Sequence, residues 1–144
     1  MELSPLLPDP RKTPGDVLTT NATVVCQRGY SDTVRHALQS FKNLIYKPYG
    51  ITTRAPQEYE VDHVVSLELG GSNAVRNLWP QSYVRTPLNA HVKDRLENRL
   101  HTLICTGQLS LSDAQQAIAK NWTTVYVTYA GPLPAGASPL PDPQ

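Results

Sequence analysis

Residues 60–79 constrain the fold of this chain more than any other segment. They begin with an apolar run that carries an adjacent acid and base, Asp62 and His63, and a Gly70-Gly71 pair follows. Because glycine adopts positive φ without steric cost, this pair predicts a reversal of the chain. Asn77 then opens a second short apolar run. The segment therefore predicts a β-hairpin.

The two arms of this hairpin are predicted at residues 59–69 and 77–79. Apolar residues of the first arm do not alternate cleanly, which predicts a bend or bulge near His63. The bend matters because neighbouring residues of a regular strand point to opposite faces. With the bend, the Asp62 carboxylate and the His63 imidazole can face the same space.

Before the hairpin, the chain predicts a short strand and a helix. Residues 21–26 include Thr-Val-Val, which favours a strand. A helix starting at Ser31 or Asp32 is predicted by apolar residues at helical spacing, and Pro48 and Gly50 end it. The apolar residues of this helix are Leu38, Phe41, Leu44 and Ile45.

After the hairpin, two helices are predicted. Thr86-Pro87 predicts the start of the first, because Thr caps a helix and Pro suits its first position, and Gly107 predicts its end. A capping box at residues 112–115 predicts the start of the second, and residues 125–129 either continue it or form a strand. The apolar stripe of the first helix consists of Val92, Leu96, Leu100, Leu103 and Ile104. The predicted fold class is α+β and mostly helical.

The proline-rich ends differ from the middle of the 144-residue chain. Residues 1–14 hold four prolines and residues 131–144 hold five. Such proline density disfavours a packed core, so we predict tails at residues 1–20 and 131–144. One small domain is predicted between them, at residues 21–130. No segment is long enough to span a membrane, so no membrane partner is expected.

The two cysteines, Cys26 and Cys105, match no metal-ligand spacing. They are either unpaired buried thiols or one disulfide. We favour the disulfide, which would close a loop of about 80 residues and stabilise the fold by roughly 4 kcal/mol at most. A disulfide implies an oxidising compartment, so the protein is expected to be secreted or periplasmic.

Asp62 and His63 together offer the chemistry of a hydrolytic site. Neutral imidazole accepts a proton from water at about pH 7, so we predict His63 as a general base. The neighbouring carboxylate can hold a divalent cation, so we predict Asp62 as a metal ligand. Asn77 could bond backbone groups and hold the His63 loop, with an ordinary turn residue as the alternative. Glu60 and Glu68 flank the pair, where either could support it.

A further metal ligand is expected on the helix after the hairpin. Asp94 and Glu97 are favoured there, because hard cations such as Mg²⁺ prefer carboxylate oxygen. His91 and Asn89 are the alternatives, and either carboxylate could instead form ion pairs within the helix. The expected cofactor is a divalent metal ion, Mg²⁺ or Mn²⁺, with Zn²⁺ or Ni²⁺ also compatible.

Basic residues on the same helix are the candidate contacts for a phosphate backbone. The net charge of the chain is only +1, so its overall charge does not predict a nucleic-acid partner. Lys93, Arg95 and Arg99 nevertheless follow the Asp-His pair closely, and could bind substrate phosphates. A solvated helix face is the alternative, since acidic residues lie among them.

The sequence resembles the HNH, or ββα-metal, nuclease family. The resemblance is carried by Asp62-His63, Gly70-Gly71, Asn77-Leu78 and the helix after them. The wider pattern, which includes Asn77-Leu-Trp-Pro-Gln, Lys93-Asp-Arg-Leu-Glu and Cys105-Thr-Gly, is similar to a small bacterial branch of exported type. The similarity covers most of the chain, from about Val25 to Tyr129.

This resemblance implies a ββα-metal core with additional flanking helices. It implies that His63 is the general base, that Asp62 binds the metal and that Asn77 positions the hairpin loop. It also implies that Cys26 and Cys105 lie close together.

The third position of the family motif, usually His or Asn on the helix, has no unambiguous counterpart. Asn89, His91 and Asp94 all lie in range.

These observations predict a metal-dependent endonuclease that hydrolyses phosphodiester bonds with little sequence preference. Nucleic acid is the expected partner, DNA rather than RNA. The ambiguous third ligand motivates an alternative, an HNH-like module that binds DNA or protein without catalysis. The proline-rich ends suggest another, a toxin-type nuclease domain.

Overall fold

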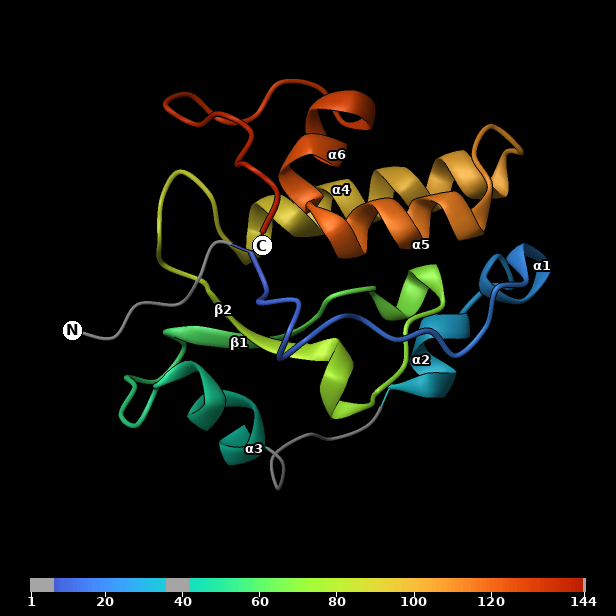
Figure 1. Ribbon diagram of the computed structural model, residues 1–144. Helices are drawn as coiled ribbons and strands as arrows, with labels where there is room; N and C mark the ends of the chain where they lie inside the picture. Colours follow the sequence, from blue (N-terminus) through green and yellow to red (C-terminus); the bar gives the residue numbers. More distant parts are fainter. Residues whose placement is uncertain (1–6, 36–41, 144) are drawn as a thin grey trace.

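A two-stranded antiparallel hairpin lies at the centre of the fold (Figure 1). In this computed structural model, which describes residues 7–35 and 42–143, strand β1 (Tyr59–His63) pairs with β2 (Leu78–Ser82). Tyr59 lies opposite Ser82, and His63 lies opposite Leu78. The protein is a small, mostly helical α+β domain in which helices follow the hairpin, as predicted.

The first arm of the hairpin is shorter than predicted. β1 ends at His63 rather than at residue 69, and the chain then forms the short 3-10 helices η3 (Leu67–Leu69) and η4 (Val75–Asn77). The predicted bend near His63 is therefore confirmed.

Both glycines of the turn are required by the backbone. Gly70 has a φ of 83°, and a Cβ atom on Gly71 would lie 1.7 Å from the carbonyl oxygen of Val65. Only glycine allows this close return of the chain, which folds the loop back beneath the end of β1.

The long helix α4 (Ala90–Cys105) packs over one side of the hairpin and α5 (Leu111–Lys120) lies alongside it (Figure 1). Helix α6 (Trp122–Tyr129) packs against both. The apolar stripe of α4 is buried as predicted, and residues 125–129 are helical.

Two predicted helix starts are wrong. The helix expected from Thr86-Pro87 begins at Ala90, because the Asn89 side chain accepts a hydrogen bond from the Val92 amide and caps it. The helix α5 is capped by Ser110 rather than Ser112, through a hydrogen bond from the Asp113 amide.

The N-terminal half forms short helices around the ends of the hairpin. The strand predicted at residues 21–26 is wrong, since the Asn21 side chain caps helix α1 (Ala22–Val25) by accepting from the Thr23 amide. The predicted helix before the hairpin is represented by α2 (Tyr30–Val34) and by α3 (Lys42–Tyr46) with η2 (Lys47–Tyr49). Its part at residues 36–41, which includes Leu38 and Phe41, lies outside the described residues.

A disulfide joins Cys26, after α1, to Cys105 at the end of α4. Their Cα atoms are 5.7 Å apart. The predicted pairing is thus confirmed, and it is consistent with an oxidising compartment. None of the helices in the described part of the chain has the length and apolar character needed to cross a bilayer.

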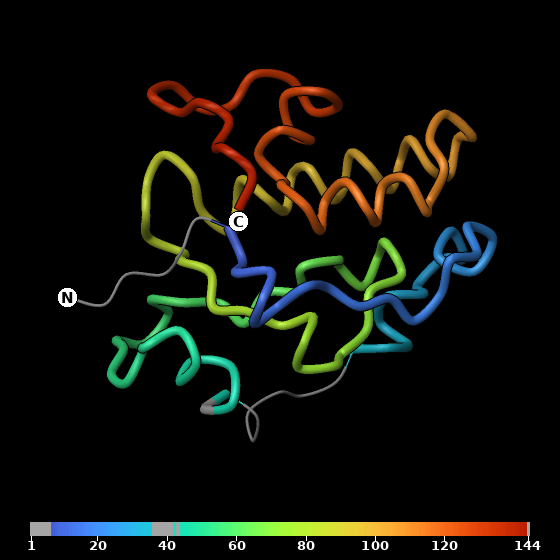
Figure 2. The backbone as a smooth tube through the Cα atoms, in the orientation of Figure 1, coloured from blue at the N-terminus to red at the C-terminus, as the bar shows by residue number. Residues whose placement is uncertain are grey.

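The described parts of both chain ends pack against the body. Val17 forms a β-bridge with Gly71, and the blue trace in Figure 2 follows this segment across the hairpin loop. Leu7, Leu133 and Leu140 pack against the core. Residues 7–20 and 131–143 therefore contact the domain between them, whereas we predicted tails at residues 1–20 and 131–144. Their proline content did not prevent leucines spaced along them from reaching apolar surface.

Candidate active site

A cleft of about 420 Å³ opens between the end of β1, helix α2 and helix α4. Its lining is acidic, with one histidine and one arginine, His63 and Arg35, beside the carboxylates. The carboxylates are Glu60, Asp62, Glu68, Asp94 and Glu97. The predicted proximity of Asp62 and His63 is thus present, because β1 ends at His63 and both residues reach the same cleft.

The side-chain amide of Asn73 holds the His63 ring and determines which ring nitrogen carries the hydrogen. Its Nε2 atom lies 2.9 Å from Oδ1 of Asn73, and the amide nitrogen of Asn73 donates to the carbonyl of Val34. Because Oδ1 can only accept, Nε2 of the neutral ring carries the hydrogen. Nδ1 therefore keeps its lone pair. Burial lowers the pKa of His63, so the ring stays neutral to a lower pH than an ordinary histidine.

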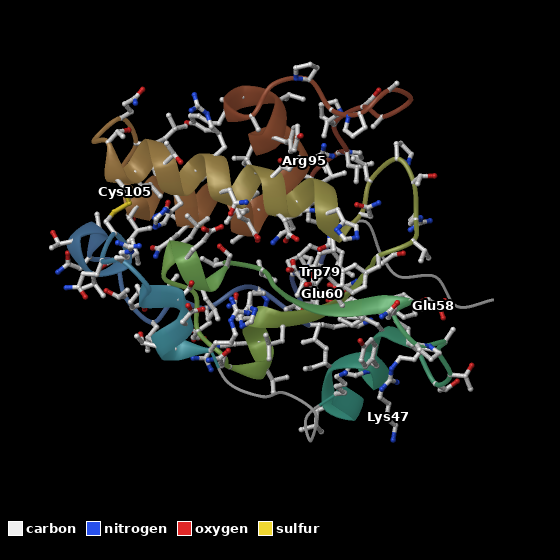
Figure 3. All side chains as sticks on the ribbon, turned by 180° about the vertical axis from the view of Figure 1, so that it is seen from behind. Lys47, Glu58, Glu60, Trp79, Arg95 and Cys105 are labelled. Carbon is white, nitrogen blue, oxygen red and sulfur yellow. A yellow bond between two sulfur atoms is a disulfide. The ribbon has the colours of Figure 1, made fainter. Side chains whose placement is uncertain are left out.

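Asp62 is buried and fixed from two directions. Its Oδ2 atom lies 2.8 Å from Nζ of Lys93 and accepts from the indole Nε1 of Trp79 at 3.2 Å. Trp79 is itself fully buried, so it holds the carboxylate rigidly. Figure 3 shows Trp79 and Glu60 between α4 and the hairpin. The sequence did not reveal the role of Trp79, although it stands opposite Asp62 in the strand register.

Lys93 is a buried structural cation rather than the predicted phosphate contact. Only 1% of it is exposed, and Nζ donates to Oε2 of Glu97 at 2.6 Å and to the carbonyl of His63 at 2.9 Å. Burial by itself would lower the pKa of Lys93, but the carboxylates of Asp62 and Glu97 outweigh burial and raise it. One ammonium thus sits between two carboxylates, which leaves an excess negative charge.

Glu97 does not lie in the group of carboxylates best placed for a metal. Its Oε2 atom is occupied by Lys93, and burial raises its pKa well above the ordinary value. Among the described residues, oxygens of Glu60, Asp62 and Asp94 instead come within 4.8 Å of one another. The carboxylates that lie closest together are therefore Glu60, Asp62 and Asp94, and not the predicted set of Asp62, Asp94 and Glu97. Glu60 could have been found from the sequence, because it lies two residues before Asp62 and so shares its strand face.

The donor set of Glu60, Asp62 and Asp94 fits a hard divalent cation. All three ligands are carboxylates, which Mg²⁺ and Mn²⁺ prefer. Burial, and to a lesser extent the nearby charge of Asp62, raise the pKa of Glu60 to about 7. The same two causes raise the pKa of Asp94. Oε2 of Glu60 is buried without a hydrogen-bond partner among the described residues. A cation would compensate both the crowded charge and this oxygen.

Arg95 and Arg99, the other predicted phosphate contacts, lie on the far side of α4. Each is two residues from Glu97, which rotates it by about 200° around the helix. Nε of Arg99 donates to the carbonyl of Tyr129, and Figure 3 shows Arg95 on the side of α4 that faces away from the hairpin. These two arginines therefore do not line the cleft. A role for them in binding substrate stays a prediction.

The alternative helix ligands are also placed elsewhere. Asn89 caps α4, and the exposed ring of His91 packs against Tyr83 with 5.2 Å between centroids. Neither residue lines the cleft.

Asn77 fastens the loop that carries His63. It is fully buried, and its Oδ1 accepts from the amides of Val65 and Asp16 while its Nδ2 donates to the carbonyls of Val65 and Ser72. These are bonds of a residue that holds the hairpin loop. A part for Asn77 in catalysis stays a prediction. The contact to Asp16 was not foreseen, because it depends on a segment distant in sequence.

No family model, curated protein or solved structure matches this chain.

Proposed function

We propose that this protein is a metal-dependent endonuclease that hydrolyses phosphodiester bonds in DNA, with a ββα-metal core formed by the hairpin and α4. The observation that supports this most is the convergence of two groups in one cleft. These groups are the free Nδ1 of His63 and the carboxylates of Glu60, Asp62 and Asp94. Phosphodiester hydrolysis requires a base for water and positive charge beside the phosphate.

A divalent cation bound by Glu60, Asp62 and Asp94 would supply positive charge to the phosphoryl oxygens and the leaving oxygen. Lys93 and Trp79 would keep the Asp62 carboxylate in one orientation, which supports a defined ligand geometry. Exposed Arg35, on the α2 side of the cleft, could contact the phosphate from the opposite wall.

His63 would accept the proton of the attacking water at Nδ1. Asn73 holds the other ring nitrogen, so the ring cannot rotate freely, and the lowered pKa keeps Nδ1 unprotonated near neutral pH. The backbone of His63 is fixed independently, because its carbonyl accepts a hydrogen bond from Lys93.

The charge of the cleft makes cation dependence a strict requirement of this proposal. Five carboxylates face one arginine and one neutral histidine in the lining, with Lys93 buried beneath them. Such a surface repels a phosphate unless a cation offsets the negative charge. The expected activity in a metal chelator is therefore zero.

A plasmid-nicking assay with Mg²⁺, Mn²⁺, Ni²⁺ and Zn²⁺ tests the proposal. We expect nicking with at least one metal and a loss of about 10²-fold or more in the His63→Ala variant. Metal affinity and melting temperature should change little in that variant, and added imidazole should restore part of the rate. His91→Ala is the matched control, since this histidine is exposed outside the cleft.

Two results would overturn the proposal. One is full activity of the His63→Ala variant. The other is the absence of cleavage of plasmid, single-stranded DNA and RNA with every metal, which would favour a module that binds without catalysis.

A further inference from the structure

A second groove, of about 520 Å³, lies at the opposite end of β1 from the cleft. It is lined by α3, the chain that follows η2 and the first residue of β1. Lys42 and Arg54 are its charged lining residues, and no carboxylate occurs among the described residues that line it. The groove is therefore basic where the cleft is acidic.

The ring of Tyr46 holds the guanidinium of Arg54 in place, and the ring of Tyr59 supports Tyr46. The guanidinium carbon lies 4.0 Å from the ring centroid of Tyr46, and this ring contacts Tyr59 edge-on with 6.0 Å between centroids. Tyr46 is buried, whereas Arg54 is exposed. Among the described residues no carboxylate forms an ion pair with Arg54. A flat, exposed and fixed guanidinium is suited to stack on a nucleic-acid base.

The groove and the proposed base lie close together along β1. Tyr59 and His63 are the first and last residues of this strand, about 13 Å from each other along it. Even at the duplex rise of about 3.4 Å per nucleotide, a strand with its scissile phosphate at His63 needs no more than about four nucleotides to reach the groove. An unpaired strand can extend further per nucleotide.

The surrounding chain reinforces the positive charge. Residues 36–57 contain three lysines and arginines and no aspartate or glutamate, and the Glu58 carboxylate that follows accepts a hydrogen bond from the amide of Ala55. One of these, Lys47, extends outward on the side of the hairpin away from α4 (Figure 3).

We propose that this groove binds an unpaired nucleic-acid strand next to the scissile phosphate, with a base stacked on Arg54 and a phosphate beside Lys42. This inference rests on the proposed function, because it assumes that the strand in the groove continues into the cleft. It assigns substrate binding to α3 and its loop, in place of the α4 arginines. The ligand must have an unpaired base, since a base within a duplex is already stacked on its neighbours.

Binding can be separated from cleavage by measuring fluorescence anisotropy of a labelled single-stranded oligodeoxynucleotide in EDTA. We expect Arg54→Ala to weaken binding by about tenfold. Lys42→Gln should reduce the slope of log affinity against log salt by about 0.7, the loss of one phosphate contact. Lys120→Gln, which removes an exposed lysine on α5, is the matched charge control and should bind like the wild type.

The competitor identifies the ligand class. Inorganic polyphosphate of equal charge should compete less well than the oligonucleotide, because it offers no base to Arg54. Equal competition, or wild-type binding by both Arg54→Ala and Lys42→Gln, would overturn the inference.

Cleavage assays on the same variants separate this inference from the proposed function. If the wild type cuts DNA but the Arg54 and Lys42 variants bind normally, only the groove is refuted. If the variants lose binding as expected while the wild type cuts nothing, the groove remains and the nuclease proposal fails.

Discussion

The cleft and the groove occupy the two ends of one short strand, yet they have opposite charge. At the His63 end, carboxylates surround a buried lysine and leave an excess of negative charge. At the Tyr59 end, a lysine and an exposed arginine line a surface without carboxylates among its described residues. The first arrangement suits a cation, and the second suits an anionic polymer.

This difference shows why the net charge of +1 says little about partners. The cleft and the groove hold separate sets of charged side chains, although Glu60 of the cleft is next in sequence to Tyr59 of the groove. Each end therefore presents its own local field to a ligand. A strand of nucleic acid could meet attraction in the groove and, with a cation present, in the cleft as well.

The largest effect should come from exchanging the buried cation of the cleft for an apolar residue. Lys93→Met leaves the buried carboxylates of Asp62 and Glu97 without their ammonium, so we expect a loss of about 3–5 kcal/mol in the free energy of unfolding. Arg54→Met in the exposed groove should change it by about 0.5 kcal/mol or less. Urea titration monitored by tryptophan fluorescence measures both.

A second substitution separates the effect of the unpaired charges from the effect of the changed side-chain size. Adding Glu97→Gln to Lys93→Met removes one of the unpaired charges, so part of the lost stability should return. A Lys93→Met protein as stable as the Arg54→Met protein would contradict the buried ion-pair network.

A smaller effect should distinguish the carboxylates of α4. Asp94→Asn removes one of three clustered ligands and should weaken Mn²⁺ binding by at least about tenfold, whereas Glu97→Gln should weaken it less, because Lys93 already occupies Oε2 of Glu97. Isothermal titration calorimetry measures both affinities. Oligonucleotide binding in EDTA should be the same in the two variants, since the groove does not contain these residues. The reverse order of metal affinities would restore the ligand set predicted from the sequence.

The smallest effect concerns pH. Burial raises the pKa of Glu60 to about 7, so below this pH a cation must displace a proton and Mn²⁺ affinity should fall by somewhat less than tenfold per pH unit. Glu60→Gln should make Mn²⁺ affinity less dependent on pH. Oligonucleotide binding in EDTA should change far less with pH, because the guanidinium of Arg54 stays charged. Calorimetric titrations with Mn²⁺ at several pH values above and below the pKa of Glu60 test this prediction.

The raised pKa of Glu60 also determines how the stability of the metal-free protein changes with pH. The folded protein holds the Glu60 proton more tightly than the unfolded chain, whose ordinary value is 4.5, so stability falls as pH rises from about 4.5 to about 7. Glu60→Gln should therefore stabilise the metal-free protein at alkaline pH, by about 1 kcal/mol after allowance for solvent screening. A destabilised Gln variant would contradict the assigned burial.

The sequence revealed the local features of the fold better than the distant ones. The hairpin, its bend at His63 and the apolar stripe of α4 follow from patterns within a few residues, and the structure confirms them. The start of α4 was misplaced because Asn89 provides a cap that competes with Thr86-Pro87. A short apolar run at residues 21–26 favoured a strand, but the Asn21 cap makes it a helix.

For the site, the sequence identified the residue types but not their partners. Asp62, His63, Asp94 and Glu97 all line the cleft. Lys93 was misinterpreted because its burial depends on how α4 packs against β1, which no local pattern encodes. Asn73 was missed for a similar reason, since its two partners, His63 and Val34, lie on separate segments.

The disulfide between Cys26 and Cys105 makes the stability of the fold depend on whether the protein is in an oxidising or a reducing compartment. It closes a loop with a sequence separation of 79, for which chain entropy gives roughly 4 kcal/mol at most. In a reducing cytoplasm the same polypeptide would lack this contribution, and we expect it to be open to proteases. For the nuclease proposed above, this dependence would limit activity in a reducing compartment, such as the one that holds the chromosome of the producing cell.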